Sequence, residues 1–234
     1  MNKKIIISSG GTGGHIFPAI NLIKHLIPKG YEVVLVTNEK TVKKYLSKIF
    51  LKNYSQLKIY TINTGTINTN NLFKSICHLP KIFISVIKSL IILKKEKPHI
   101  VIGFGSYISF PISFCSRFFN TSLILYESNL VLGRANKYLL PIAKYLLVAS
   151  AFPVNLPKIY KKKVYKIGAI LSKNIINYRP KKKSKKKYFS ILVLGGSQGA
   201  EVFGKVLPLT MKMLKDQGYK IKIIQQCLKY QKKK

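Results

Sequence analysis

Short apolar runs alternate with longer amphipathic segments along the chain, which predicts repeated strand–helix–strand units. The expected strands are residues 4–9, 32–37, 58–62, 100–104, 122–126, 145–149, 164–167, 189–194 and 220–225. The expected helices are residues 15–26, 39–48, 72–95, 107–119, 134–141 and 199–217. Strands that alternate with helices in this way pair in parallel, so the pattern predicts an α/β fold around a parallel sheet.

The predicted units form two groups that a lysine-dense stretch separates. Residues 1–160 predict an N-terminal Rossmann-like domain, and residues 161–188 predict a solvated lysine-rich linker between domains. Residues 189–234 hold one strand–helix–strand unit, which is too small to form an independent core. We therefore expect a second domain that begins in this sequence and is truncated.

The scarcity of acidic residues and cysteines excludes several kinds of site. The 234 residues include Asp+Glu 6, and no two carboxylates lie close together in sequence. This argues against a carboxylate cage for Mg²⁺ or Ca²⁺. The three cysteines are far apart and fit neither a disulfide framework nor a zinc cluster. We expect no metal site.

The positive charge has three interpretations. Lys+Arg 42 give a formal net charge of +36, which suits an anionic membrane surface, nucleic acid, or a lysine-rich codon bias without function. Almost all of these residues are lysine, whereas specific nucleic-acid readout usually relies on arginine. We therefore expect no nucleic-acid partner, and we keep a basic nucleic-acid-binding protein as the last alternative.

One segment, residues 72–93, suits the surface of a membrane. Apolar residues dominate it, and Lys74, Lys81 and Lys88 recur every seven residues, so they share one stripe of a helix. An interfacial helix with basic flanks has this pattern. A core helix that covers the sheet is the other interpretation.

Two glycine turns follow predicted strands and precede predicted helices. The first is Gly10-Gly11-Thr12-Gly13-Gly14-His15, and the second is Gly195-Gly196-Ser197-Gln198-Gly199. Glycines allow close approach of the backbone to a ligand, and the start of the next helix offers free N–H groups and a positive dipole end. These turns suit an anionic group, above all a diphosphate. A tight turn without a ligand is the alternative.

Other glycine-loop sites fit less well. Ile16 stands where G-x-G-x-x-G requires its last glycine, which weakens an NAD site, although Glu39 is placed like a ribose-binding acid. No G-x-x-x-x-G-K-[ST] motif occurs, which excludes a P-loop.

Four collinear motifs together resemble the MurG family of peptidoglycan N-acetylglucosaminyltransferases. The first is the turn at Gly10 with the following Ile16-Phe17-Pro18-Ala19, which resembles the N-terminal family signature. The segment 97–111 resembles KPDVVxGxGGYxSxP, and 126–129 with 133–137 resembles HEQN…GxxNK. The segment 192–200 resembles VLVxGGSQGA. The resemblance covers essentially the whole chain.

The resemblance implies a GT-B fold, in which two Rossmann-like domains face each other across a cleft. Residues 1–160 would be the acceptor- and membrane-binding domain, and residues 189–234 the truncated donor-binding domain. It implies an inverting transfer of N-acetylglucosamine (GlcNAc) from UDP-GlcNAc to the C4 hydroxyl of undecaprenyl-diphospho-MurNAc-pentapeptide, a step of peptidoglycan synthesis, without metal or cofactor. The implied partners are these two substrates and an anionic membrane. The implied location is peripheral, on the cytoplasmic face of the cell inner membrane.

The same motifs assign candidate residues. His15 is the candidate general base for the acceptor hydroxyl, because a neutral imidazole suits that role near pH 7; its other interpretation is a residue that only orients the turn. Glu127 is the second candidate catalytic residue, which would orient His15 or the acceptor; its other interpretation is helix capping ahead of Arg134. The positions that match the family's donor contacts are Thr12, Gly13, Gly14, Asn129 and Ser197. Gly196 and Gln198 are further candidate substrate-binding residues.

The chain departs from the family pattern at several motif positions. Tyr126 and Ser128 replace the His and Gln of HEQN, and Ser106 replaces the second glycine of GGY. The family's GNPVR reads Gly168-Ala169-Ile170-Leu171-Ser172 here. The loss of its arginine is expected to weaken donor binding by roughly a few kcal/mol. A non-catalytic remnant, or a lipid-diphosphate-binding acceptor module without a donor pocket, is therefore the first alternative to a transferase.

Overall fold

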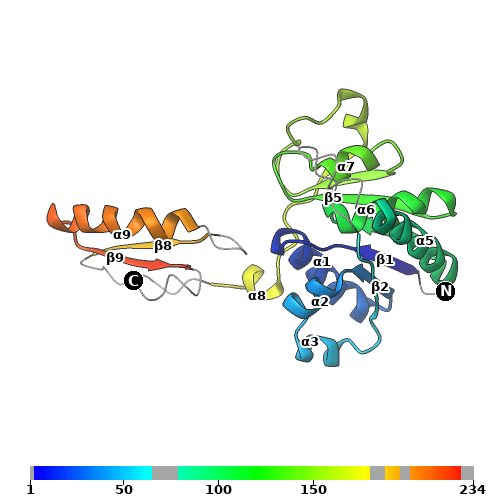
Figure 1. The fold of residues 1–234 in the computed structure, drawn as a ribbon, viewed down its shortest axis with the longest axis horizontal. Coiled ribbons are helices and arrows are strands. Elements are labelled where there is room, and N and C mark those ends of the chain that lie inside the picture. Colours follow the sequence, from blue (N-terminus) through cyan, green and yellow to red (C-terminus); the bar gives the residue numbers. More distant parts are fainter. Residues whose placement is uncertain (1–2, 65–78, 180–187, 196–200, 228–234) are drawn as a thin grey trace. The chain divides into compact units, whose positions relative to one another are not determined.

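The computed structural model describes residues 3–64, 79–179, 188–195 and 201–227. They divide into two compact units, Met1–Ile176 and Asn177–Lys234 (Figure 1). Each unit is described by itself below.

The first unit is built on a seven-stranded parallel sheet with the order β3-β2-β1-β4-β5-β6-β7. The strands are β1 Lys4–Ser8, β2 Glu32–Thr37, β3 Lys58–Thr61, β4 Ile100–Gly103, β5 Ser122–Glu127, β6 Tyr145–Val148 and β7 Val164–Lys166. Ile6 in the interior strand β1 pairs with Val34 on one side and Val101 on the other. The strand order reverses between β1 and β4, which is where open α/β sheets bind ligands at the carboxyl ends of their strands.

Helices cover both faces of this sheet, each over its own apolar core. They are α1 Gly13–Leu26, α2 Glu39–Tyr45, α3 Lys48–Asn53, α5 Leu79–Glu96, α6 Ser106–Cys115, α7 Arg134–Leu139 and α8 Lys173–Ile176, with 3-10 turns at Ile27–Lys29, Ser116–Phe118 and Lys158–Lys163. Alternate β1 residues face opposite cores: Ile5 and Ile7 join the cluster of α1, and Ile6 joins the cluster of α5 and α6. Figure 1 shows α5 and α6 packed side by side.

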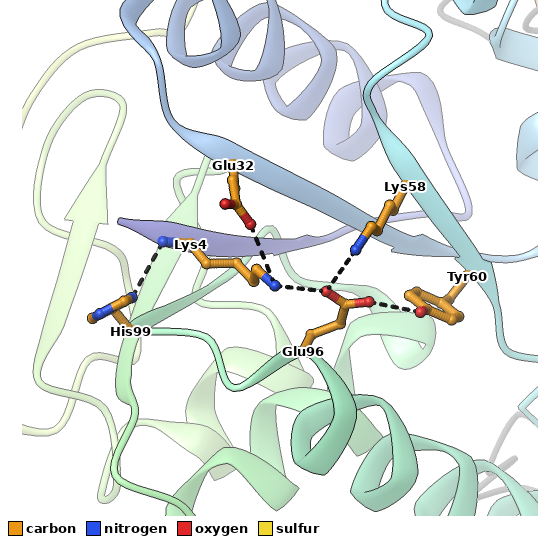
Figure 2. A network of polar contacts seen from close by, with 6 residues as sticks. All are labelled: Lys4, Glu32, Lys58, Tyr60, Glu96 and His99. Carbon is orange, nitrogen blue, oxygen red and sulfur yellow. Dashed lines mark hydrogen bonds and ion pairs between the residues drawn. The ribbon is translucent and has the colours of Figure 1, made fainter. Parts of the chain in front are cut away.

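One polar network fastens the end of α5 to the amino ends of the strands, at the edge opposite the carboxyl ends. The carboxylate of Glu96 is 2% exposed and accepts from Lys4 Nζ at 3.0 Å, Lys58 Nζ at 3.4 Å and the Tyr60 hydroxyl at 2.7 Å. Lys4 Nζ also lies 3.3 Å from Glu32. Figure 2 shows Lys4 from β1 and Lys58 and Tyr60 from β3 meeting Glu96, while Glu32 from β2 contacts Lys4. The network joins the helix to three strands that are distant in sequence.

The strand predictions are confirmed, because every expected strand is present with its ends shifted by at most one residue. The helix predicted at 39–48 is instead two helices, since Asn38 caps α2 and Ser47 caps α3 through their side-chain oxygens. The helix predicted at 72–95 is described from Leu79 onward; residues 72–78 lie outside the described part.

The first unit continues to Ile176, beyond the boundary at 160 that the sequence predicted. The reason is pairing: β7 adds to the sheet beside β6, with Val164 opposite Leu146. Only the later part of the expected linker 161–188 therefore falls outside this unit.

The second unit contains β8 Phe189–Val193, α9 Glu201–Asp216 and β9 Ile221–Gln225, and the two strands pair in parallel. None of the residues described in this unit is buried. Val202, Val206, Leu209 and Met213 form an exposed apolar stripe along α9. In the described ranges, no helix has the length and apolar character needed to cross a membrane.

Candidate active site

The turn after β1 requires glycine for space and for backbone conformation. A Cβ at position 10 would lie 2.6 Å from Ile108 Cδ1, which is a steric clash. Gly11 has φ +84°, in the left-handed region that favours glycine. Thr12 then takes an extended conformation as the residue before α1. Glycine at positions 10 and 11 therefore allows the chain to turn from β1 into α1 within a few residues.

His15 is held in one orientation at the mouth of α1. Its Nδ1 lies 3.0 Å from the Thr12 hydroxyl, and its ring packs over Gly105, where a Cβ would lie 3.3 Å from Nε2 and Cδ2. When Nδ1–H donates to Thr12, Nε2 keeps its lone pair and can accept a proton. Burial lowers the pKa of His15, and the negative charge of Glu127 opposes this shift. The imidazole is therefore neutral at pH 7, as a general base must be.

Two helix N-termini meet beside His15. Helix α1 begins at Gly13, and α6 begins at Ser106. The two starts are close together, because a Cβ added to Gly11 would lie 3.7 Å from the Cβ of Ser106. Neither helix has an acidic residue in its first turn. First-turn amides have no partner within their own helix, and the positive dipole ends favour an anion. This corner of the sheet can bind a negatively charged group.

Ser106, the first residue of α6, has an unfavourable backbone conformation, and its hydroxyl group is unsatisfied within the described part of the chain. It has φ +74°, and its hydroxyl is buried without a hydrogen-bond partner among the described residues. A non-glycine residue in this region of φ costs on the order of 1 kcal/mol. The departure from the family's glycine at this position is therefore a local source of backbone strain.

Glu127 organises the loop that follows β5. Its carboxylate is 2% exposed and accepts four N–H groups: the amide and side chain of Asn129 at 3.0 and 2.9 Å, the amide of Gly133 at 2.9 Å and the side chain of Asn136 at 3.0 Å. Gly133 is the residue before α7. No hydrogen bond joins Glu127 to His15 in the described part of the chain, so Glu127 acts on His15 through its charge.

Asn136 belongs to this site, although sequence reasoning did not single it out. Its side chain is 1% exposed and donates to the Tyr126 carbonyl at 3.1 Å and to Glu127, while its Oδ1 has no partner among the described residues. The side-chain nitrogen lies near Gly105, at 3.5 Å from a Cβ built there. Its place in the 133–137 motif was the signal that could have identified it.

The structure brings together only part of the predicted site. Thr12, Gly13, Gly14 and His15 share the first turn, and Glu127 and Asn129 lie at the end of β5, with the Asn129 side chain exposed. Gly196, Ser197 and Gln198 lie outside the described residues. Within the described ranges, no cluster of three or more His, Cys, Asp and Glu side chains is placed to hold a metal ion.

The sheet order and the glycine turn at its switch point define a Rossmann-like domain. The family model and the solved MurG structure described next show that this domain is the N-terminal half of a GT-B glycosyltransferase fold. Residues 5–148 match the family model described as the glycosyltransferase family 28 N-terminal domain. The chain belongs to this family.

Similar proteins extend the match over nearly the whole chain. A relative from Rickettsia canadensis is 35% identical over 96% of this chain, and one from Pelagibacter ubique is 36% identical over 97%. Both are named UDP-N-acetylglucosamine–N-acetylmuramyl-(pentapeptide) pyrophosphoryl-undecaprenol N-acetylglucosamine transferase. This chain spans 61% and 60% of their respective lengths. The crystal structure of Acinetobacter baumannii MurG matches with a TM-score of 0.73 and 26% identity, over 98% of this chain and 62% of that one.

Proposed function

We propose that this chain takes part in the transfer of GlcNAc from UDP-GlcNAc to the C4 hydroxyl of undecaprenyl-diphospho-MurNAc-pentapeptide, with inversion and without a catalytic metal. The observation that carries the proposal is His15, neutral and anchored by Thr12, at the point where the N-termini of α1 and α6 meet. The names of the similar proteins support the choice of substrates.

In this mechanism the first glycine turn binds the acceptor diphosphate through the first-turn amides of Gly13 and Gly14. The acceptor C4 oxygen attacks the anomeric carbon of the donor from the face opposite UDP, and the bond from that carbon to the UDP oxygen breaks. His15 Nε2 takes the hydroxyl proton, and UDP leaves with the bonding electrons. Glu127 stabilises the imidazolium by its charge.

The donor side of this mechanism involves the second glycine turn. Gly196, Ser197 and Gln198 are proposed to contact UDP-GlcNAc, as their match to the family motif implies. Asn129, exposed beside the Glu127 carboxylate, is proposed to bind a sugar hydroxyl.

The alternative is an acceptor-binding module without transfer activity. The difference in burial between the two units favours this alternative. The first unit has two apolar cores, whereas none of the residues described in the second unit is buried. A transfer assay with labelled UDP-GlcNAc separates the two functions, because the module would bind the lipid acceptor and release no UDP.

Helix α5 is the proposed contact with an anionic membrane. Phe83, Ile87 and Ile91 lie four residues apart on one face and are 67%, 41% and 59% exposed. Lys88 and Lys95 are exposed on the same helix. An apolar stripe with basic neighbours suits the surface of an anionic bilayer. The proposed location is peripheral, on the cytoplasmic face of the inner membrane.

Gly14→Asp tests the acceptor site. Gly14 is exposed, and the nearest heavy atom to an added Cβ is Thr12 Oγ1 at 3.8 Å, so the side chain is accommodated. An acidic residue in the first turn stabilises a helix but repels a diphosphate placed there. We expect binding to vesicles that contain the lipid-diphosphate acceptor to weaken by roughly tenfold or more, with no fall in melting temperature.

Gly14→Asn is the matched control, since it has the same size without the charge, and it should bind far better than Gly14→Asp. Vesicles with undecaprenyl monophosphate show how much of the affinity depends on the diphosphate. Equal binding of wild type and Gly14→Asp would remove the acceptor diphosphate from this turn.

The membrane proposal is tested with Phe83→Ser/Ile87→Ser. Both side chains are exposed, so the fold should tolerate the change, while the apolar contact with lipid is lost. We expect sedimentation with anionic vesicles lacking acceptor to weaken by about 10- to 100-fold. Ile49→Ser on α3, where Ile49 is 73% exposed, is the control and should bind like wild type. Unchanged binding of the α5 double variant contradicts the proposal.

A further inference from the structure

The segment 168–172, called the strap below, follows β7 and ends the first unit together with α8. Side chains bind both the backbone N–H and the backbone carbonyl of its central residue, Ile170. The N–H of Ile170 donates to the Tyr126 hydroxyl at 3.3 Å, and the carbonyl of Ile170 accepts from Asn21 Nδ2 at 3.2 Å. The partners are 44 and 149 residues away in sequence. Both backbone polar groups of one strap residue are therefore satisfied by distant side chains.

Both partners lie on rigid elements that also build the candidate active site. Tyr126 is 3% exposed, pairs with Leu147 within the sheet, and packs against Phe104 with ring centroids 5.2 Å apart. Its carbonyl accepts from Asn136, and Glu127 is the next residue. Asn21 lies in α1, the helix that begins at the glycine turn. The strap is thus hydrogen-bonded directly to the two elements that carry His15 and Glu127.

The hydrogen bond from Ile170 to Tyr126 joins two residues that both depart from the family motifs quoted above. Position 170 corresponds to the proline of GNPVR, and position 126 corresponds to the histidine of HEQN. Proline has no N–H, so isoleucine adds a donor that must find an acceptor when the strap packs down. Ile170 does pack, against the core cluster of α1. The Tyr126 hydroxyl provides the acceptor that this N–H needs.

We propose that Tyr126 and Asn21 clamp the backbone N–H and carbonyl of Ile170 and so fix the strap at the end of the first unit. We also propose that Tyr126 and Ile170 are a compensating pair, in which the hydroxyl accepts from the N–H that a proline would lack. Gly168 gives the strap its turn after β7, with φ +86° and no heavy atom within 4 Å of an added Cβ. Tyr126 positions the strap and does not touch substrate. This inference does not depend on the proposed function.

A double-mutant cycle on the full chain tests the pair. Tyr126→Phe keeps the ring but leaves the Ile170 N–H without its acceptor. We expect hydrogen exchange at the Ile170 amide to rise about tenfold, and the equilibrium constant for unfolding by urea to rise by a similar factor. In the Ile170→Pro background the N–H is gone, so Tyr126→Phe should change the unfolding constant by less than about twofold.

Tyr145→Phe is the matched control, because its ring packs edge-on against Tyr165 in the same sheet; it should leave Ile170 exchange unchanged. Equal costs of Tyr126→Phe in both backgrounds would overturn the pairing. If Ile170→Pro does not fold, the clamp is tested by comparing hydrogen exchange at the Ile170 amide in Tyr126→Phe with that in Tyr145→Phe. Unchanged exchange there refutes the clamp, whether or not the chain binds lipid acceptor.

Discussion

Replacing His15 with alanine should lower the rate of GlcNAc transfer by about 10²- to 10⁴-fold, the range for loss of a general base. The reason is local geometry: Thr12 holds Nδ1 at 3.0 Å and leaves Nε2 to take the acceptor proton. Binding of the lipid acceptor should change little, because the first-turn amides that we propose as the diphosphate site remain. The measurements are transfer of labelled GlcNAc and vesicle binding on the same preparations.

Thr12→Val is the companion variant, since it removes the hydroxyl that orients the imidazole and keeps the imidazole itself. We expect an intermediate loss of rate, of about tenfold. If His15→Ala transfers as fast as wild type, His15 is not the base and serves only to orient the turn.

The pH dependence gives an independent check on His15. The proposed mechanism needs the neutral imidazole, so the rate of transfer should fall on the acidic side as pH drops through the pKa of His15. Burial lowers that pKa, so the acidic limb of kcat/KM should lie below about 6.5, the ordinary value for histidine. An acidic limb above that value contradicts the assignment.

The largest effect on stability is expected from Glu96→Ala, which should lower the free energy of unfolding by about 3 kcal/mol. The substitution leaves Lys4, whose side chain is 21% exposed, without its buried partner, and it removes the 2.7 Å hydrogen bond from Tyr60. Lys58 is 58% exposed and solvent-screened, so it contributes little. Urea unfolding followed by circular dichroism measures the loss.

Glu32→Gln is the matched control for this network. Glu32 contacts the same Lys4 at 3.3 Å but is 55% exposed, so its loss should cost less than about 1 kcal/mol. A cost for Glu32→Gln equal to that of Glu96→Ala would show that burial is not what makes Glu96 important.

The sign of the acid dependence follows from the pKa of Glu96. Burial alone would raise this pKa, but hydrogen bonds from Tyr60 and Lys4 and the two lysine charges outweigh burial and lower it. The contribution of Glu96 is therefore present above its unfolded pKa of about 4.3 and is lost as pH falls through the lower folded pKa. Glu96→Ala should flatten the stability curve of the chain in that acidic window.

The sequence alone predicted the elements whose determinants are local. The strands follow from short apolar runs, and the first turn follows from glycines beside a strand and a helix start. His15 and Thr12 are three residues apart, so their contact is a property of one helical turn. The missed break between α2 and α3 was local too: Ser47 accepts from Phe50 and starts a new helix, a capping signal present in the sequence.

Only the tertiary structure decided which distant residues meet. Gly105 lies against the ring of His15 because the strand order places β4 beside β1, and Asn136 lies near Gly105 because β5 is the next strand after β4. A hydrophobic pattern does not specify that order. The same holds for the Tyr126 hydroxyl beneath Ile170 and for Lys4 beside Glu96, 92 residues apart. Periodicity reports which face of an element is buried, whereas a polar contact depends on register and packing between elements, which the folded chain sets as a whole.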